Sequence, residues 1–298
     1  MKNKQELVSI ILNCYNGEKF LAEALLSLKN QTYKNWELIF WDNRSTDSSK
    51  EIVFSFKFKN LRYFLSKKHT SLYEARNLAI KKVKGKFICF IDTDDLWEKD
   101  KIKNQLKLFK DKETAVVYGN SYLKNEKNNK IKKFINYEVS SGYIYKKLIK
   151  NYDVGILTTM IKRSFLKKSK IIFNKKYNII GDFDFFINLS KNYKFQYISQ
   201  PIATYRIHEN NLSSINKNIQ IQELQDWLNR NKNRLSSDEK KNFKRRIIQL
   251  KFIEKKFNTN FFKTFSFFVK QNRLLISLKN IFILIIPKIY LKKLIWFS

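Results

Sequence analysis

Two kinds of hydrophobic pattern alternate along the first 120 residues. Short, nearly continuous apolar runs predict buried β-strands at residues 8–12, 36–41, 61–65, 86–91 and 115–118. Between them, apolar residues recur every three or four positions. This spacing predicts helices at residues 20–28, 71–83 and 96–110. A further helix is predicted directly after a polar loop at residues 43–49. Such alternation is typical of an α/β layered domain built on a mainly parallel sheet.

The pattern changes after residue 120. Residues 121–140 are polar and rich in Lys and Asn, which predicts a hairpin or a surface excursion. Residues 213–258 are strongly charged with helical spacing. We therefore expect one α/β domain over residues 1–213 and a helical, basic C-terminal extension over residues 214–298.

The composition of the chain excludes intrinsic disorder and several kinds of binding site. With 43% hydrophobic residues, the chain is too apolar to be intrinsically disordered. No two of its 6 glycines are spaced as Gly-x-Gly, and Gly85-Lys86 lacks the first glycine of a P-loop, so both phosphate-binding fingerprints are excluded. Two Cys and two His are too few for a disulfide framework or a multi-histidine metal site.

The formal net charge of +34 allows two interpretations. It fits a polyanionic partner, or a compositional bias toward Lys, Asn, Ile and Phe. Residues 255–298 hold nine basic residues and no acidic one among large apolar side chains. This composition suits an amphipathic segment on an anionic membrane face, although a helical pair packed on the domain or a dimer contact would also fit.

No signal peptide and no transmembrane helix is predicted, because no apolar run has the required length. We therefore expect a cytoplasmic protein, and peripheral binding to the inner face of the plasma membrane is one of the alternatives left open for residues 255–298.

Acidic residues follow two of the predicted strands. Asp42 ends the second strand, and Asp92, Asp94 and Asp95 follow the fourth. In parallel sheets ligands bind beyond the carboxyl ends of the strands. Three carboxylates in four residues repel one another, and Mg²⁺ or Mn²⁺ held with substrate phosphates would relieve that repulsion. The alternatives are a solvated acidic turn, or a helix N-cap in which Asp94 or Asp95 caps a helix beginning near Leu96.

Four segments in order resemble the family 2 glycosyltransferases, which have the GT-A fold. They are the opening 8–49 with its D-[DN]-x-S-T-D loop, ARNLAIKKVKGKFICFIDTDDLW at 75–97, GDFDFFINL at 181–189 and YRIHENNLS at 205–213. The resemblance implies an α/β/α sandwich that binds a nucleotide-diphosphate sugar. It further implies a nucleotide-binding half at 1–120 and an acceptor and catalytic half at 121–213.

The resemblance also implies roles in donor binding. Tyr15 and Asn43 would lie against the nucleobase with Asp42 nearby, and Arg76 would stand near the donor phosphates. Asn43 replaces the family's usual second aspartate. Since an amide donates as well as accepts, the base preference stays open between UDP and dTDP.

By the same resemblance, five residues would surround the metal and the diphosphate. Asp95 would be the main metal ligand with Asp92 in support, and Asp94 would contact the ribose and the metal. Arg206 and His208 would approach the diphosphate or the metal.

The general base would be Asp182. The family's preceding glutamate is Gly181 here, and Asp184 is the other candidate for the base. A single carboxylate opposite the leaving group gives one in-line displacement, which predicts inversion at the anomeric carbon.

We therefore expect an inverting, Mg²⁺- or Mn²⁺-dependent glycosyltransferase of the hexosyltransferase type (EC 2.4). Its acceptor would be a hydroxyl of a saccharide or lipid-linked saccharide, in bacterial surface polysaccharide or lipopolysaccharide assembly. The alternatives are a metal-dependent nucleotidyltransferase and a non-enzymatic, basic nucleic-acid-binding protein. A nucleic-acid partner is not expected, because clustered carboxylates repel phosphates and no nucleic-acid-binding motif is present. The oligomeric state stays open.

Overall fold

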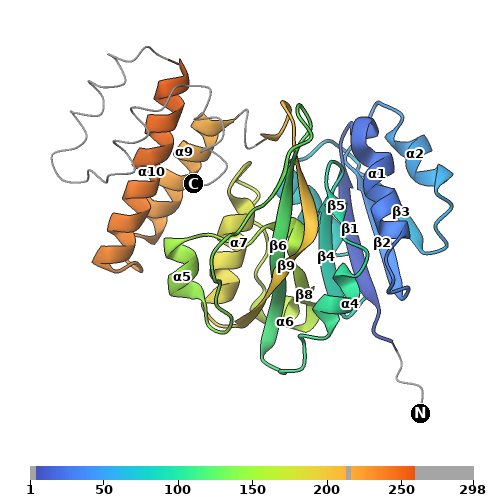
Figure 1. Ribbon diagram of the computed structural model, residues 1–298, viewed down its shortest axis with the longest axis horizontal. Helices are drawn as coiled ribbons and strands as arrows, with labels where there is room; N and C mark the ends of the chain where they lie inside the picture. Colours follow the sequence, from blue (N-terminus) through green and yellow to red (C-terminus); the bar gives the residue numbers. More distant parts are fainter. Residues whose placement is uncertain (1–4, 213–215, 259–298) are drawn as a thin grey trace. The chain divides into compact units, whose positions relative to one another are not determined.

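The computed structural model describes residues 5–212 and 216–258, which belong to two compact units that divide between His208 and Glu209 (Figure 1). Most of the basic segment predicted at 255–298 lies outside the described residues. The division into a domain at 1–213 with two halves and an extension at 214–298 stays a prediction.

Four parallel strands form the first half of the sheet in the order β3-β2-β1-β4. Their bounds are β1 Val8–Cys14, β2 Trp36–Asp42, β3 Leu61–Leu65 and β4 Phe87–Asp92. All four strands were predicted from their apolar runs, and the structure confirms them. Their parallel pairing brings the carboxyl ends, with the acidic residues that follow, to one edge.

The second half of the sheet is mixed. Its strands are β5 Leu96–Trp97, β6 Thr114–Asn125, β7 Ile131–Lys133, β8 Met160–Lys162 and β9 Lys194–Ile207. β8 lies antiparallel between β4 and β6, β6 pairs in parallel with β9, and β9 pairs antiparallel with β5. β7 forms a hairpin with β6, as predicted for 121–140. The β9–β5 pairing brings Arg206 next to the acidic loop after β4.

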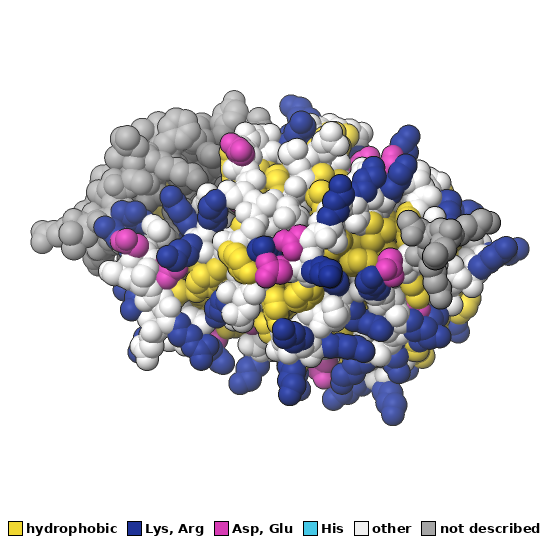
Figure 2. Space-filling model, turned by 90° about the horizontal axis from the view of Figure 1, so that it is seen from below, with side chains coloured by type: hydrophobic (Ala, Val, Ile, Leu, Met, Phe, Trp, Pro, Cys, Tyr) yellow, Lys and Arg dark blue, Asp and Glu magenta, His cyan; other side chains and the backbone are white. Residues whose placement is uncertain are grey.

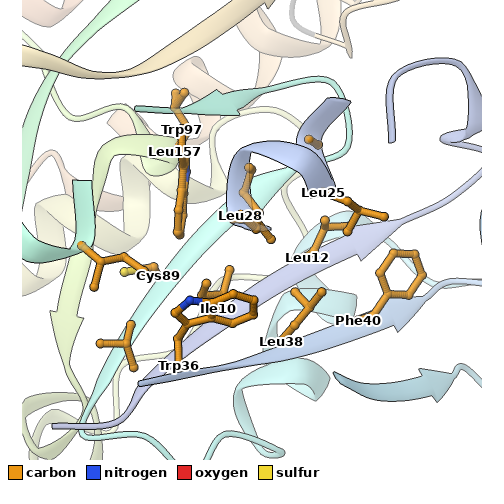
Figure 3. Close-up of a cluster of buried hydrophobic side chains, with 14 of the residues drawn as sticks. Ile10, Leu12, Leu25, Leu28, Trp36, Leu38, Phe40, Cys89, Trp97 and Leu157 are labelled. Carbon is orange, nitrogen blue, oxygen red and sulfur yellow. The ribbon is translucent and has the colours of Figure 1, made fainter. Parts of the chain in front are cut away.

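Helices cover both faces of the parallel half. The first unit contains α1 Glu18–Lys29, α2 Ser49–Ser55, α3 Leu72–Ile80, α4 Lys101–Leu106, α5 Tyr145–Lys150, α6 Arg163–Ser169, α7 Gly181–Ser190 and a 3₁₀ turn at Ile156–Thr158. Leu25 and Leu28 of α1 pack with Ile10, Leu12 and Leu38 in the main hydrophobic cluster (Figure 3). α3 lies against β1 and β2 through its buried alanines.

The helix predicted from Leu96 to Lys110 is wrong at its start. Leu96 and Trp97 instead pair with Thr204 and Ala203 of β9, and the helix begins only at Lys101. Trp97 is buried, so burial in the sheet outweighs the helical spacing. The alternative in which Asp94 or Asp95 caps a helix is therefore excluded.

The second unit contains α9 Lys217–Asn231 and α10 Ser237–Asn258. Trp227 and Phe243 stack between them with ring centroids 4.9 Å apart. This confirms the helical prediction for the described part of 213–258. Among the described residues, no helix combines the length and the apolarity that a membrane span requires.

Lys and Arg side chains are spread over the face shown in Figure 2 rather than gathered in one patch.

Candidate active site

Two loops at the carboxyl ends of β1 and β2 are bonded to each other. The backbone N–H of Glu18 donates to Asp47 (2.9 Å), that of Gly17 donates to Ser49 (3.0 Å), and that of Asn16 donates to Ser45 (3.1 Å). These contacts satisfy N–H groups at the start of α1, whose N-cap residue is a glycine. The Ser/Thr/Asp loop after β2 therefore fixes the backbone around Tyr15.

Asp42 and Asn43 are buried and bonded within the protein. Asp42 accepts from the Tyr63 hydroxyl (2.5 Å) and from the backbone N–H of Ser45 (2.7 Å). The Asn43 amide donates to the Thr70 carbonyl (2.8 Å) and accepts from the Thr70 backbone N–H (3.1 Å) and hydroxyl (3.0 Å). An amide satisfies this donor and acceptor set, whereas a carboxylate could only accept. This accounts for Asn43 in place of the family's second aspartate.

Tyr15 is the exposed member of the predicted nucleobase group, with 54% of its surface accessible. Its ring lies 4.3 Å from the ring of His69, whose Nδ1 is 3.1 Å from the carbonyl oxygen of Asn43. Sequence reasoning missed His69. A lone histidine in a polar stretch carries no periodic or motif signal, and only the fold of 66–70 against Asn43 brings it here.

Arg76, Asp92 and Asp182 lie close to one another, and their roles in donor binding and catalysis stay predictions. One guanidinium nitrogen of Arg76 donates to both carboxylate oxygens of Asp92, at 2.8 and 2.9 Å. Burial raises the pKa of Asp182, and the charge of Arg76 partly offsets that rise. Asp184, the other candidate base, accepts instead from Asn188 of its own helix at 3.2 Å.

Asp94, Asp95 and His208 lie together in the loop after β4 and at the end of β9. His208 Nε2 lies 2.9 Å from Asp94 Oδ2, and both side chains are partly exposed. Asp95 is buried and accepts from the backbone N–H of Arg206 at 3.3 Å. Burial raises the pKa of both carboxyl groups, that of Asp95 the more, and the neighbouring aspartates raise them further.

These residues fit a hard divalent cation. Buried carboxylates that repel one another favour a bound cation, and His208 lies beside them. Within residues 5–212 and 216–258, no three His, Cys, Asp or Glu side chains are placed so that together they could hold a metal ion. Mg²⁺ is usually held by one or two carboxylates with substrate phosphates and water, so an open set of this kind suits it.

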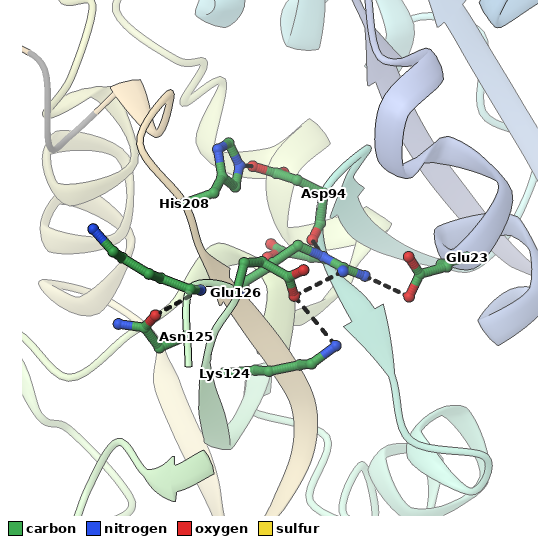
Figure 4. Close-up of polar contacts among 9 residues, drawn as sticks. Glu23, Asp94, Lys124, Asn125, Glu126 and His208 are labelled. Atoms are coloured by element: carbon green, nitrogen blue, oxygen red, sulfur yellow. Dashed lines mark hydrogen bonds and ion pairs between the residues drawn. The ribbon is translucent and has the colours of Figure 1, made fainter. Parts of the chain in front are cut away.

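Arg206 connects the acidic loop to two other elements. Its guanidinium donates to Glu23 of α1, to Glu126 after β6 and to the backbone carbonyl of Asp94, each at 2.9 Å. Figure 4 labels these three partners. Arg206 is 1% exposed and lies over the Phe20 ring. Its observed contacts therefore hold the loop of Asp94, and its contact with a diphosphate stays a prediction.

Replacing Arg206 by Met is expected to lower the free energy of unfolding. Removing one member of a buried ion pair costs ~3–5 kcal/mol, and we expect the lower end because Glu23 is half exposed. Urea unfolding measures the change, with Arg206→Lys as the control that keeps the charge. An unchanged unfolding curve for Arg206→Met would contradict this role.

Comparison with known proteins identifies the family. The model of glycosyl transferase family 2 matches residues 9–189. The chain is 30% identical over 210 residues to the Escherichia coli UDP-Glc:alpha-D-GlcNAc-diphosphoundecaprenol beta-1,3-glucosyltransferase WfgD, covering 70% of this chain and 80% of WfgD. It is 27% identical over 217 residues to the putative teichuronic acid biosynthesis glycosyltransferase TuaG of Bacillus subtilis, covering 72% and 84%.

Solved structures confirm the fold. The Staphylococcus aureus TarS 1–349 structure in complex with UDP-GlcNAc aligns with a TM-score of 0.61 at 19% identity, over 82% of this chain and 72% of TarS. The mannosyltransferase PcManGT of Pyrobaculum calidifontis, in complex with GDP-Man and Mn²⁺, aligns with a TM-score of 0.57 at 15% identity, over 76% and 65%. The α/β layers, the acidic strand ends and the family match agree: the chain belongs to glycosyltransferase family 2 and has the GT-A fold.

Proposed function

We propose that this glycosyltransferase moves a sugar from a UDP- or dTDP-sugar to a hydroxyl of a saccharide or lipid-linked saccharide. One observation carries the proposal: the parallel register places Asp42 beside Cys14 and Asp92 beside Asn13. The exposed Tyr15 and the aspartates after β4 therefore share one edge of the sheet. A nucleobase on Tyr15, the donor's diphosphate and a metal ion at these aspartates could therefore lie side by side along this edge.

The donor is held by groups at this edge. The Tyr15 and His69 rings offer an aromatic surface for the nucleobase. Asp94 and Asp95, with His208 beside them, would hold Mg²⁺ or Mn²⁺ together with the phosphates of the donor. When bound, the ion neutralises the charge that develops on the leaving diphosphate. UDP is the favoured nucleotide because WfgD is named for UDP-Glc and TarS was solved with UDP-GlcNAc.

Asp182 acts on the acceptor. Its raised pKa makes the carboxylate a stronger base than an exposed aspartate, which helps it to take the proton of the attacking hydroxyl. A base on the face opposite the leaving group gives a single displacement and inverts the anomeric centre. NMR of the product's anomeric proton tests this, and retention would contradict it.

A lipid-linked acceptor in bacterial surface glycan assembly is the favoured class, because WfgD is named for a diphosphoundecaprenol acceptor and TuaG for teichuronic acid biosynthesis. Peripheral binding to the inner face of the plasma membrane would bring the enzyme to such an acceptor. The full chain should then sediment with anionic liposomes more than a 1–254 truncation does, and equal sedimentation would count against the idea.

A donor screen tests the proposal directly. With Mn²⁺ present, a UDP- or dTDP-sugar should raise the midpoint of thermal unfolding more than a GDP-sugar does. Turnover of the stabilising donor should release a nucleoside diphosphate. Release of pyrophosphate from a nucleoside triphosphate incubated with a sugar 1-phosphate would instead indicate a nucleotidyltransferase, and salt-sensitive RNA binding without turnover would indicate a nucleic-acid-binding protein.

A further inference from the structure

Gly181, the first residue of α7, lies directly against the ring of Tyr73 in α3. A Cβ atom at position 181 would come within 2.5 Å of Tyr73 Cδ2 and Cε2 and within 2.7 Å of Cγ. Real Cβ contacts are essentially never that short. The tyrosine ring therefore occupies the space that any side chain at 181 would need.

The ring cannot swing aside freely, because it is packed on its other sides. Tyr73 is 3% exposed, its ring stacks with Phe173 at 5.7 Å, and the Arg76 guanidinium carbon lies 5.4 Å from its centroid. Phe173 is stacked in turn on Phe185 of α7 at 4.0 Å. Moving the ring would disturb the packing between α3 and α7.

The hydroxyl of Tyr73 contacts the chain on both sides of Gly181. It donates to the carbonyl oxygen of Ile179 at 2.8 Å and lies 3.5 Å from Asp182 Oδ1. The same carboxylate oxygen accepts from the backbone N–H of Phe183 at 2.8 Å. One tyrosine thus fixes the backbone before the helix and touches the carboxylate in its first turn.

We propose that Tyr73 is the positioning residue of Asp182, and that Gly181 is required because the tyrosine ring takes its side-chain space. The inference rests on the proposed role of Asp182 as the general base. It also explains why this chain has glycine where its family has glutamate: a side chain at 181 would collide with the residue that orients the base.

Tyr73→Phe tests the hydroxyl with little change in packing. Losing the hydroxyl that holds the Ile179 carbonyl and lies 3.5 Å from the Asp182 carboxylate should lower kcat about two- to tenfold, while the KM for the donor stays unchanged. Tyr33→Phe is the matched control, because the Tyr33 hydroxyl also donates to a backbone carbonyl, that of Glu6, at 2.5 Å, but lies in the loop between α1 and β2. Equal kcat values for the two variants would overturn the proposal.

A double-mutant cycle tests the ring. Gly181→Ala alone should lower kcat by roughly tenfold or more, whereas in a Tyr73→Leu background, where no ring is present, the same change should cost less than about twofold. Gly119→Ala is the crowded control, since its Cβ would lie 2.7 Å from Ile202 Cδ1 in the sheet. Its cost should be the same in both backgrounds.

If Gly181→Ala fails to fold, recovery of folding in the Tyr73→Leu background supports the proposal, and failure in both backgrounds overturns it. An equal cost of Gly181→Ala in both backgrounds also overturns it. Asp182→Asn separates the two levels of the account. Full activity of Asp182→Asn would contradict the assignment of Asp182 as the base. If Asp182→Asn is inactive but Tyr73→Phe and Gly181→Ala keep wild-type activity, only the positioning role is overturned.

Discussion

Asp95→Asn is expected to abolish sugar transfer and, at the same time, to raise the midpoint of thermal unfolding of the metal-free protein. Asp95 is 1% exposed, and its pKa is raised first by burial and then by Asp94 and Asp92. A raised carboxyl pKa means that the ionised group destabilises the folded state at neutral pH, because the unfolded chain releases the proton more readily. An amide removes that cost and still accepts the hydrogen bond from Arg206.

The catalytic loss has a different cause. Without the Asp95 carboxylate, the site loses a ligand of the ion that neutralises the leaving diphosphate, so kcat/KM should fall by roughly a thousandfold or more. Thermal unfolding with and without Mn²⁺ provides the check. The ion should stabilise the wild type and leave Asp95→Asn unchanged. A fully active Asp95→Asn, or one stabilised by Mn²⁺ as much as the wild type, would rule out Asp95 as the main metal ligand.

Asp182→Asn should lower kcat by ~10²–10⁴-fold, the usual contribution of a positioned general base. Binding of UDP with Mn²⁺ should be unchanged, because the amide has the same shape and the metal ligands are untouched. Single-turnover assays and isothermal titration calorimetry measure the two quantities separately.

Asp184→Asn is the matched control in the same helical turn. Asp184 bonds to Asn188 within α7, and an amide oxygen can still accept that bond, so activity should stay within about threefold of the wild type. The reverse result, an active Asp182→Asn and an inactive Asp184→Asn, would assign the base to Asp184.

Most of the parallel half of the fold could be predicted because β1, β2 and β4 are buried on both faces and so read as continuous apolar runs. The helix predicted from Leu96 shows where this reasoning fails. Its apolar spacing fitted a helix, but Leu96 and Trp97 pair with β9, which lies more than 100 positions later in the chain. Local spacing contains no information about such a partner.

The candidate site was predicted unevenly for a similar reason. Asp42 and the aspartates at positions 92, 94 and 95 could be found because they stand at the carboxyl ends of predicted strands, where parallel sheets bind their ligands. His69, Glu23 and Glu126 carry no such signal, since each reaches the site only through the fold of a separate segment. Arg206 was expected near the phosphates, but its observed partners are carboxylates and a backbone carbonyl.

The central proposal is that the aspartates after β4 hold a divalent ion that contacts the diphosphate of the donor. Crystals soaked with Mn²⁺ and UDP, with data collected at the manganese absorption edge, test it directly. The account predicts an anomalous peak within about 2.3 Å of an Asp95 oxygen and of a diphosphate oxygen. UDP bound with no anomalous peak beside Asp94 and Asp95, or a peak elsewhere, would contradict it.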